Sequence, residues 1–149
     1  MKGKIEEVKT LTDDELAYLH DLVNVVPGLL IHDDCLRAQF GKMMQYGHLL
    51  VHRAPNGLID GVVGFYSNDK AEFMAKIMYI AVDERSRRQG IGGMLLDAVV
   101  EQSQNDGMRQ VSLQVLSSNE KARRLYISHG YQEIPEEADG DRLEMRRLV

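Results

Sequence analysis

The sequence predicts a mixed α/β fold, with seven strands and four helices in the order β-α-α-β-β-β-α-β-α-β-β. Two observations support this prediction. Both helical apolar spacing and strand-like alternation occur along the chain, and helices alternate with strands only in its second half, which favours a mixed sheet over a uniform doubly wound one. The 149 residues, 44% of them hydrophobic, suffice for one core, so we expect a single domain over residues 1–149.

Composition excludes several classes of protein. The 18 Lys and Arg residues against 23 Asp and Glu give a net charge of −5, whereas a general nucleic-acid binder needs a basic face. The longest apolar stretch, residues 22–31, is interrupted and too short to span a membrane. Residues 1–7 lack the apolar core of a signal peptide, and the single cysteine, Cys35, excludes an internal disulfide framework. We therefore expect a cytoplasmic protein that binds neither nucleic acid nor membrane.

The first part of the chain predicts a strand followed by two helices. The strand is expected over Ile5–Val8. Thr12 and Glu15 have the spacing of a capping box, and Pro27-Gly28 ends the helix that follows. The apolar positions of that helix are Leu16, Leu19, Val23 and Val26. Asp33 can cap a second helix, whose apolar face comprises Leu36, Phe40, Met43 and Met44.

A hairpin and a central strand come next. His48–Arg53 and Gly61–Ser67 are typical of strands, and Pro55-Asn56-Gly57 between them contains Asn-Gly, the strongest short turn signal. Ala75–Val82 is mostly apolar on both faces, which indicates a strand buried in the centre of the sheet.

The second half alternates helices with strands. A helix begins after Gly90 and ends at Gly107, and its predicted face is Ile91, Met94, Leu95, Ala98, Val99 and Gln102. Gln110–Leu116 alternates as a strand does, and Asn119–His129 predicts a helix that Gly130 closes. The last two strands are expected at Tyr131–Ile134 and Arg142–Leu148, joined by an acidic turn over Glu136–Asp141.

The segment between the central strand and the next helix has the features of an anion site. Arg87-Arg88-Gln89-Gly90-Ile91-Gly92 joins a strand to a helix N-terminus, where backbone N–H groups and the helix dipole favour a phosphate. Glycine lets the backbone approach such a ligand closely. Six of the 18 basic residues lie in two short segments near this turn and the next helix, which indicates a ligand with several phosphates: Arg85, Arg87, Arg88, Lys121, Arg123 and Arg124.

Two common nucleotide sites do not fit this segment. A dinucleotide fingerprint needs a third glycine at position 95, which is Leu95, and an acidic residue after the next strand, which ends Val115-Leu116-Ser117. The Gly-Lys-Ser/Thr sequence of nucleoside triphosphatases is absent.

The glycine segment resembles the Arg/Gln-x-x-Gly-x-Gly/Ala signature of the Gcn5-related N-acetyltransferase (GNAT) superfamily. The preceding residues Ile77–Val82 are similar to the fourth strand of that superfamily. A second motif, Asn-x-x-Ala-x-x-Leu-Tyr followed by Gly-Phe/Tyr, is matched by Asn119, Ala122, Leu125, Tyr126, Gly130 and Tyr131. The resemblance covers Ala75–Ile134 and implies a mostly antiparallel central sheet flanked by helices, the acetyl-CoA N-acyltransferase fold.

The resemblance implies that acetyl-CoA is bound and that coenzyme A is a product. Its pyrophosphate would lie on the backbone from Arg87 to Gly92, with Gly93 close behind. Its pantetheine arm would pair like an extra strand near Ile80, Ala81 and Val82, where a bulge in the fourth strand is expected to separate it from the fifth. Asn119 and Ala122 of the second motif would complete the cofactor contacts, although Asn119 could also simply cap its helix.

The implied reaction is direct attack of an amine on the thioester in a ternary complex. A backbone N–H near Ile80 would stabilise charge on the carbonyl oxygen. Tyr126 matches the family tyrosine that protonates or hydrogen-bonds the coenzyme sulfur, and the alternative for this residue is core packing.

The sequence departs from the family at the general base. Several relatives carry a glutamate near the start of the fourth strand, where this chain has Lys76. The candidates that could replace it are Glu72, Asp69, Tyr79 and His32, of which Glu72 and Asp69 are more simply solvated turn residues.

The acceptor is the open question of the sequence. We expect a small-molecule primary amine, with a protein or peptide amine and a non-catalytic acyl-CoA-binding regulator as alternatives. The resemblance implies that the first two helices and the last two strands shape this site. The residues expected there are Leu29, Leu30, His32, Phe40, Tyr66, Asn68 and the acidic turn. A homodimer is implied only by resemblance. We expect no metal site, because His48 and His52 would lie about 13 Å apart on one strand.

Overall fold

A seven-stranded mixed sheet forms the centre of the computed structural model, which describes residues 3–24 and 33–149, with the backbone alone over residues 33–37. The strands lie in the order β1-β2-β3-β4-β5-β7-β6, and only β4 and β5 run parallel. Their bounds are β1 Lys4–Glu7, β2 His48–Arg53, β3 Ile59–Tyr66, β4 Met74–Val82, β5 Gln110–Leu116, β6 Gln132–Asp139 and β7 Arg142–Leu148. The predicted fold class, element order and central position of β4 are confirmed.

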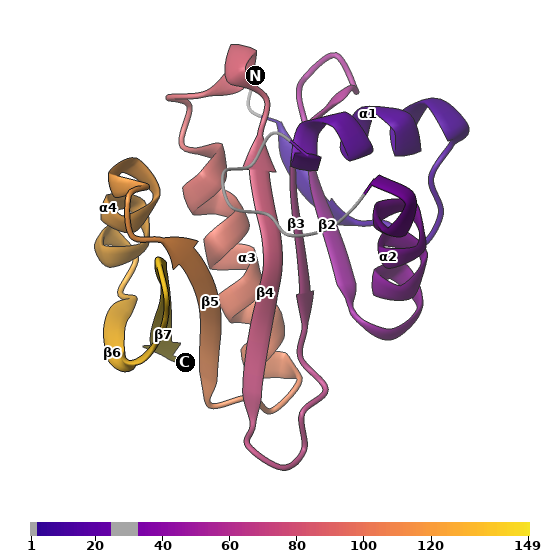
Figure 1. The fold of residues 1–149 in the computed structure, drawn as a ribbon. Helices are drawn as coiled ribbons and strands as arrows, with labels where there is room; N and C mark the ends of the chain where they lie inside the picture. The colour runs from indigo at the N-terminus through magenta and orange to yellow at the C-terminus, as the bar shows by residue number, and fades with distance from the viewer. Residues whose placement is uncertain (1–2, 25–32) are drawn as a thin grey trace.

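Helices cover both faces of this sheet (Figure 1). The helices are α1 Asp13–Asn24, α2 Asp33–Tyr46, α3 Ile91–Asn105 and α4 Glu120–Ser128. Helix α3 packs on one face, where its buried residues join those of β3, β4 and β5 in one core cluster. Helices α1 and α2 pack on the other face of β2, β3 and β4 and form a second cluster. No described helix is long and apolar enough to cross a membrane.

Helix α1 begins with the predicted capping box. The Thr12 N–H donates to Glu15 Oε1 and the Glu15 N–H donates to Thr12 Oγ1, both at 3.1 Å. The predicted apolar residues Leu19 and Val23 are fully buried. The predicted end of this helix at Pro27-Gly28, together with Val26, lies outside the described residues.

Helix α2 has the predicted apolar face where its side chains are described. Phe40 and Met43 are buried, and Met44 packs against their cluster. Asp33 is the first helical residue, and the side chains of Asp33, Cys35 and Leu36 lie outside the description.

The predicted hairpin between β2 and β3 is confirmed. Gly57 has a φ of +87°, and its N–H donates to the carbonyl of Ala54 at 2.8 Å. The Asn56 side chain accepts from the Leu58 N–H at 3.0 Å. The left-handed backbone at Gly57 explains why Asn-Gly is the residue pair at this turn.

The C-terminal hairpin differs from its prediction in one respect. The acidic residues Glu136–Asp139, expected in a turn, continue strand β6, and the turn is confined to Gly140 and Asp141. Strand β6 is longer than the strand propensity of its acidic residues favours, because it pairs with β7. The register of this pairing shifts between Ile134 and Asp139.

Helix α3 buries a face slightly rotated from the predicted one. Ile91, Leu95 and Val99 are buried as expected, but Leu96 is also buried, whereas Met94 and Ala98 are half-exposed. Helix α3 packs against both the sheet and α4, so its buried face is wider than that of a helix that packs on a sheet alone.

Candidate functional site

Strands β4 and β5 are paired only at one end. The parallel ladder joins Met74 to Gln110, Ala75 to Val111 and Lys76 to Ser112, and no pair between these strands follows. Because backbone groups of a strand point alternately to its two sides, the part of β4 beyond Lys76 has an edge towards β5 without a strand partner. The strands thus form a split in the middle of the sheet, which is where an extended polar ligand could add main-chain hydrogen bonds.

A bulge at Met78 accompanies the split. Gly64 of β3 pairs with Tyr79 and Phe65 pairs with Ile77, so Met78 is the extra residue of β4. The bulge changes which side chains face which helix. Ile77 belongs to the α3 cluster, whereas Tyr79 belongs to the α1/α2 cluster. The bulge and the separation of strands, expected only by resemblance, are both present.

The glycine segment leads from the open end of β4 into α3. Gly90 is the N-cap of α3 with a φ of +76°, and no side chain caps this helix. Arg88 also has a positive φ of 67°. The first N–H groups of an α-helix have no partner within it, so this uncapped turn offers donors to an anion. No atom of the described residues lies within 4 Å of where a Cβ of Gly90 would be.

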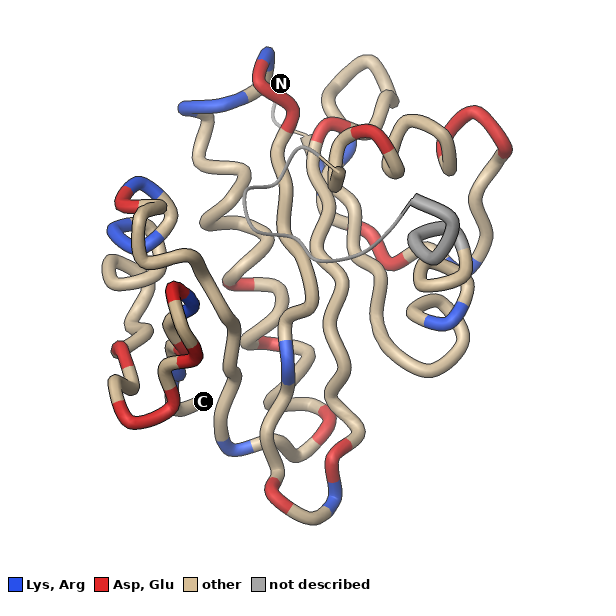
Figure 2. The backbone as a smooth tube through the Cα atoms, in the orientation of Figure 1, with Lys and Arg blue, Asp and Glu red and all other residues tan. Residues whose placement is uncertain are grey.

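The basic residues around this turn fall into two groups. Figure 2 shows basic residues on the loop before α3 and on α4, at the same end of the sheet. Arg85 forms an ion pair with Asp83 at 3.1 Å, and Arg123 forms one with Glu133 at 2.6 Å. These two arginines therefore have structural partners, which sequence clustering could not reveal. Of the six basic residues in these two segments, four form no ion pair with a described residue: Arg87, Arg88, Lys121 and Arg124.

Several predicted site residues meet in the α3 cluster. Ile91 and Tyr126 are buried in it, and Ile80, Val82 and Ala122 pack against it. The side chain of Ala81 lies on the opposite face, in the α1/α2 cluster. Ala81 therefore contributes only its backbone to the edge of β4 at the split.

Tyr126 lies in the core beside a second tyrosine. Its ring makes an edge contact with that of Tyr131, with ring centroids 6.0 Å apart. Burial raises the pKa of Tyr126 to about 12. The residue is buried, with 8% of its surface exposed, and its hydroxyl makes no hydrogen bond within the described residues.

The second motif positions α4 against the start of α3. Asn119 is the N-cap of α4, and its side chain accepts from the Ala122 N–H at 3.3 Å, so the capping interpretation is confirmed. A Cβ on Gly92 would lie 3.3 Å from Leu125, and one on Gly93 would lie 2.8 Å from the His129 ring. Glycines in the first turn of α3 therefore let α4 pack closely on it.

The candidate bases are not equivalent. Lys76 is exposed on β4. Asp69 accepts from the backbone N–H groups of Glu72 and Ala71, which lowers its pKa, and Glu72 is exposed in the same turn. Tyr79 is buried with its ring over Gly64, and burial raises the pKa of its hydroxyl well above the usual range. None of these has the surroundings of an activated base, and His32 lies outside the described residues.

Two further contacts near the site escaped the sequence analysis. The Tyr18 hydroxyl of α1 donates to Asp83 Oδ2 at 2.7 Å, just after β4. Asp83 also caps the short 3-10 helix η1, Glu84–Ser86, through the Arg85 N–H. The side-chain hydrogen bonds from Arg85 and Tyr18 and the backbone N–H of Arg85 lower the pKa of Asp83 far below its ordinary value. No local sequence pattern connects residues 65 positions apart.

The predicted acceptor residues are dispersed. Phe40 is a core residue with an edge contact to Tyr79 at 5.5 Å between ring centroids. The Tyr66 hydroxyl is buried and has no hydrogen-bond partner among the described residues, and Asn68 donates to the carbonyl of Tyr46 at 3.3 Å. Leu29 and Leu30 lie outside the described residues.

The two strand histidines have carboxylate partners instead of a shared ion. His52 Nδ1 lies 2.5 Å from Asp60 Oδ1 in a buried pair, and His48 lies between Glu7 at 3.1 Å and Asp106 at 2.8 Å. Within residues 3–24 and 33–149, no group of three or more His, Cys, Asp or Glu residues could hold a metal ion.

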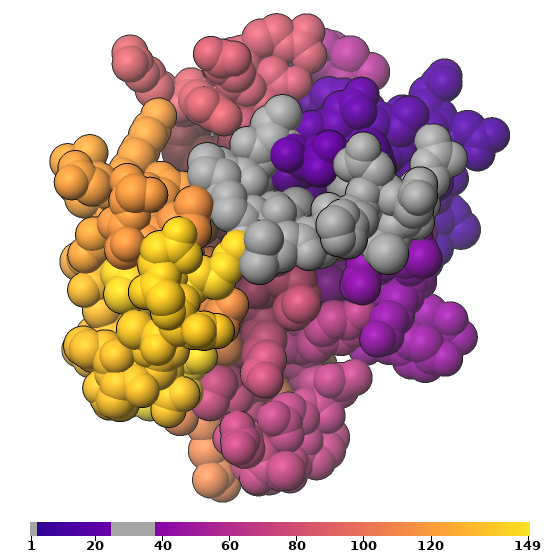
Figure 3. Space-filling model, viewed as in Figure 1, coloured from indigo at the N-terminus to yellow at the C-terminus, as the bar shows by residue number. Residues whose placement is uncertain are grey.

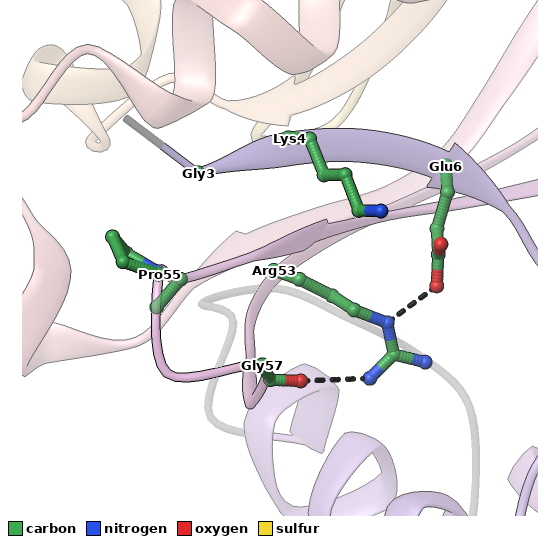
Figure 4. A pocket seen from close by; sticks show the side chains of 7 residues that line it. Gly3, Lys4, Glu6, Arg53, Pro55 and Gly57 are labelled. Atoms are coloured by element: carbon green, nitrogen blue, oxygen red, sulfur yellow. Dashed lines mark hydrogen bonds and ion pairs between the residues drawn. The ribbon is translucent and has the colours of Figure 1, made fainter. Parts of the chain in front are cut away.

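A surface pocket of about 510 Å³ lies at the β1 edge of the sheet. Figure 4 shows Arg53 between Glu6 and the carbonyl of Gly57, and its third nitrogen donates to Glu15 at 3.0 Å. Each of the three guanidinium nitrogens therefore has a partner. Three strands away from β4, this pocket does not belong to the split.

Comparison with known proteins agrees with this geometry. Residues 17–131 match the model of a family described as "Acetyltransferase (GNAT) family". No curated protein sequence matches the chain. Among solved structures, Ard1 from Thermoplasma volcanium is 22% identical with a TM-score of 0.78, covering 100% of this chain and 99% of that one.

Two further structures share the fold over nearly their full length. A GNAT family acetyltransferase from Elizabethkingia anophelis, solved with acetyl-CoA bound, is 18% identical with a TM-score of 0.74 and 99% coverage of both chains. An IAA acetyltransferase from Bacillus cereus is 19% identical with a TM-score of 0.73, covering 99% of this chain and all of that one.

Proposed function

Because this chain belongs to the GNAT acetyltransferase family, we propose that it transfers the acetyl group of acetyl-CoA to a primary amine of a small molecule, by direct attack in a ternary complex. The observation that carries the proposal is the split between β4 and β5, which opens beside the uncapped, glycine-started helix α3. A strand edge and a phosphate-binding turn are the two features that an elongated, phosphorylated cofactor requires.

The residues around the split fit acetyl-CoA by their chemistry. The N–H groups of the Gly90 turn would bind its pyrophosphate, and the four unpaired basic residues near it would balance the remaining phosphate charge. The free edge of β4 at Ile80, Ala81 and Val82 would pair with its amide-containing arm. Bound in this way, acetyl-CoA supplies an activated acetyl thioester.

The chain contributes orientation and hydrogen bonds to the transfer. A backbone N–H near Ile80 would donate to the carbonyl oxygen as negative charge develops there. Tyr126 would donate a hydrogen bond to the departing sulfur. Since its pKa of about 12 lies above that of a thiol, near 8.5, Tyr126 would keep its proton and would stabilise the departing thiolate by a hydrogen bond.

An acceptor screen tests the proposal. The protein is incubated with isotopically labelled acetyl-CoA and a bacterial metabolite extract, and labelled acetyl products are sought by mass spectrometry. A labelled small molecule is the expected result. Labelled protein with no labelled small molecule would favour a protein or peptide acceptor, and cofactor binding without any labelled product would favour a non-catalytic binder.

A further inference from the structure

A row of polar residues crosses the sheet just where the split closes. Lys76 of β4 pairs with Ser112 of β5, and Ser112 pairs with Arg146 of β7. Residues directly opposite each other in a ladder project from the same face of a sheet. Lys76, Ser112 and Arg146 therefore share one face at the closed end of the split.

The row faces away from α3. Its chain neighbours point into the α3 core cluster: Ala75, Ile77, Val111, Leu113 and Met145. The row consequently lies on the face that α1 and α2 cover only in part. Figure 3 shows this face, with the central strand visible between the C-terminal hairpin in yellow and the N-terminal helices in indigo and purple.

Two cations of this row can reach one ligand. Strands are about 4.8 Å apart, so the Cα atoms of Lys76 and Arg146 are roughly 10 Å apart with Ser112 between them. Both side chains are long enough to converge across that distance. An exposed lysine within the central strand of the sheet is unusual, because central positions are normally buried. Figure 2 shows a single basic position in β4, whose only basic residue is Lys76.

Nearby carboxylates do not neutralise the row. Glu144 pairs with Nε of Arg146, which leaves the two terminal nitrogens of that guanidinium without a hydrogen bond in the described part of the chain. Asp69 is close enough for the charge of Lys76 to contribute to lowering its pKa, but the two form no ion pair within 4.0 Å. The charges of Lys76, Arg146 and Glu144 sum to +1, so the closed end of the split is positive although the whole chain has a net charge of −5.

The row lies within the length of a small molecule from Ile80, where the acetyl transfer is proposed to take place. From Lys76 to Ile80, a strand rises about 3.3 Å per residue, or roughly 10 to 13 Å in all. A bound substrate would span less than this distance if the Lys76 side chain extends towards Ile80. Met78, in the bulge between the two positions, is 45% exposed and offers apolar contact along the way.

We infer that the side chains of Lys76 and Arg146 form an anion subsite that binds a carboxylate of the acceptor. Ser112 only spaces the two cations, because it is buried and its hydroxyl donates to the carbonyl of Ala75 at 3.4 Å. The inference rests on the proposed function and narrows it: the acceptor is a small amine that also carries an acidic group, such as an amino acid. It also gives a reason for a lysine where several family members have a glutamate, since a carboxylate there would repel such an acceptor.

Product binding tests the subsite independently of turnover. The probes are the twenty N-acetyl amino acids and their carboxamides, titrated calorimetrically into the protein saturated with coenzyme A. At least one N-acetyl amino acid is expected to bind at least tenfold more tightly than its carboxamide. Lys76→Gln should remove that preference, Lys76→Arg should retain it, and Lys70→Gln, an equal charge change in the β3–β4 loop, should leave it unchanged.

The results separate the two proposals. Equal binding of acids and amides, binding of neither, or a preference that survives in Lys76→Gln overturns the anion subsite. The free amino acids and their carboxamides are then assayed with acetyl-CoA. Retained carboxylate preference without any acetyl transfer would leave the subsite intact and contradict the proposed transferase reaction.

Discussion

At the scale of single residues, burial changes the acidity of the Tyr126 hydroxyl. A phenol with a pKa of about 12 is a poor proton donor but a persistent hydrogen-bond donor, because it stays protonated throughout the working pH range. The sequence motif identifies the residue but not this difference, which depends on the core that surrounds it.

If the Tyr126 hydroxyl acts on the leaving sulfur as proposed, replacing Tyr126 with Phe should lower kcat about 10- to 100-fold, with less than a twofold change in the affinity for acetyl-CoA. Steady-state kinetics with an acceptor from the screen and calorimetric binding measure the two effects. Tyr131→Phe is the matched control, since it removes the buried, unpartnered hydroxyl of the neighbouring ring. Equal turnover in wild type and Tyr126→Phe would refute the assignment.

The raised pKa of Tyr126 predicts a specific pH profile. A tyrosine with the ordinary pKa near 10 would lose its proton around pH 10, whereas Tyr126 remains protonated there. The kcat of the wild-type protein should therefore stay level from pH 8 to pH 10. A decline centred near pH 10 that is absent from Tyr126→Phe would show that the hydroxyl titrates in the ordinary range.

Partners also decide what charged residues can do. Arg85 and Arg123 belong to the basic clusters in the sequence, but each is bound to a carboxylate in the fold. The clustering of basic residues could be predicted from the sequence. Their pairing could not, because Arg123 meets Glu133 through the packing of α4 on β6.

At the scale of elements, Asp83 connects α1 to the end of β4. It accepts from Tyr18 on α1 and from Arg85 on η1, at the entrance to the glycine segment. Asp83→Asn should therefore reduce the free energy of unfolding at pH 7 by about 1–3 kcal/mol, the usual value of hydrogen bonds to a charged group.

The pH dependence of that loss follows from the lowered pKa of Asp83. A carboxylate with a depressed folded-state pKa stabilises the fold above its unfolded pKa, near 3.9, and loses that contribution as the pH falls towards the folded value. The difference between wild type and Asp83→Asn, measured by urea unfolding, should narrow below about pH 4. Glu84→Gln, at the adjacent exposed position, should show little difference at any pH. A difference that is constant from pH 7 to pH 3 would contradict the role of charge.

Elements with a clear apolar periodicity could be predicted closely from the sequence. The existence of β4 could be predicted as well, but its bulge could not. Its sequence, MAKIMYIAV, is apolar on both faces except at Lys76, so a change of face at Met78 leaves no break in alternation. The bulge is detectable only from the pairing with β3. The same limit applies to β6, whose acidic residues are typical of a turn until pairing with β7 is known.

At the scale of the whole molecule, the candidate site depends on contacts between distant segments. The sequence motifs cover the glycine turn and α4, which are local, and could be predicted. The split and the row of Lys76, Ser112 and Arg146 depend on the order of β4, β5 and β7, which no local pattern contains. The glycine turn and the cap of α4 could thus be predicted from the sequence, whereas the placement of the row could not.

Acetyl-CoA should stabilise the whole fold. A ligand at 100 times its Kd stabilises the native state by about 2.7 kcal/mol, so the Tm should rise by several degrees for a chain of this length. Differential scanning fluorimetry with acetyl-CoA, and with adenosine as the control that lacks phosphates, measures this shift. An equal shift with adenosine would show that the phosphates contribute nothing.

The central claim is that acetyl-CoA binds through the turn that begins α3. Its most direct test is calorimetric titration of acetyl-CoA into Gly90→Leu and Gly107→Leu. Both glycines have positive φ and open surroundings, at opposite ends of the same helix, so the two substitutions strain the backbone similarly. Binding should be lost or weakened more than 100-fold in Gly90→Leu and retained in Gly107→Leu. Normal affinity in Gly90→Leu would contradict the account.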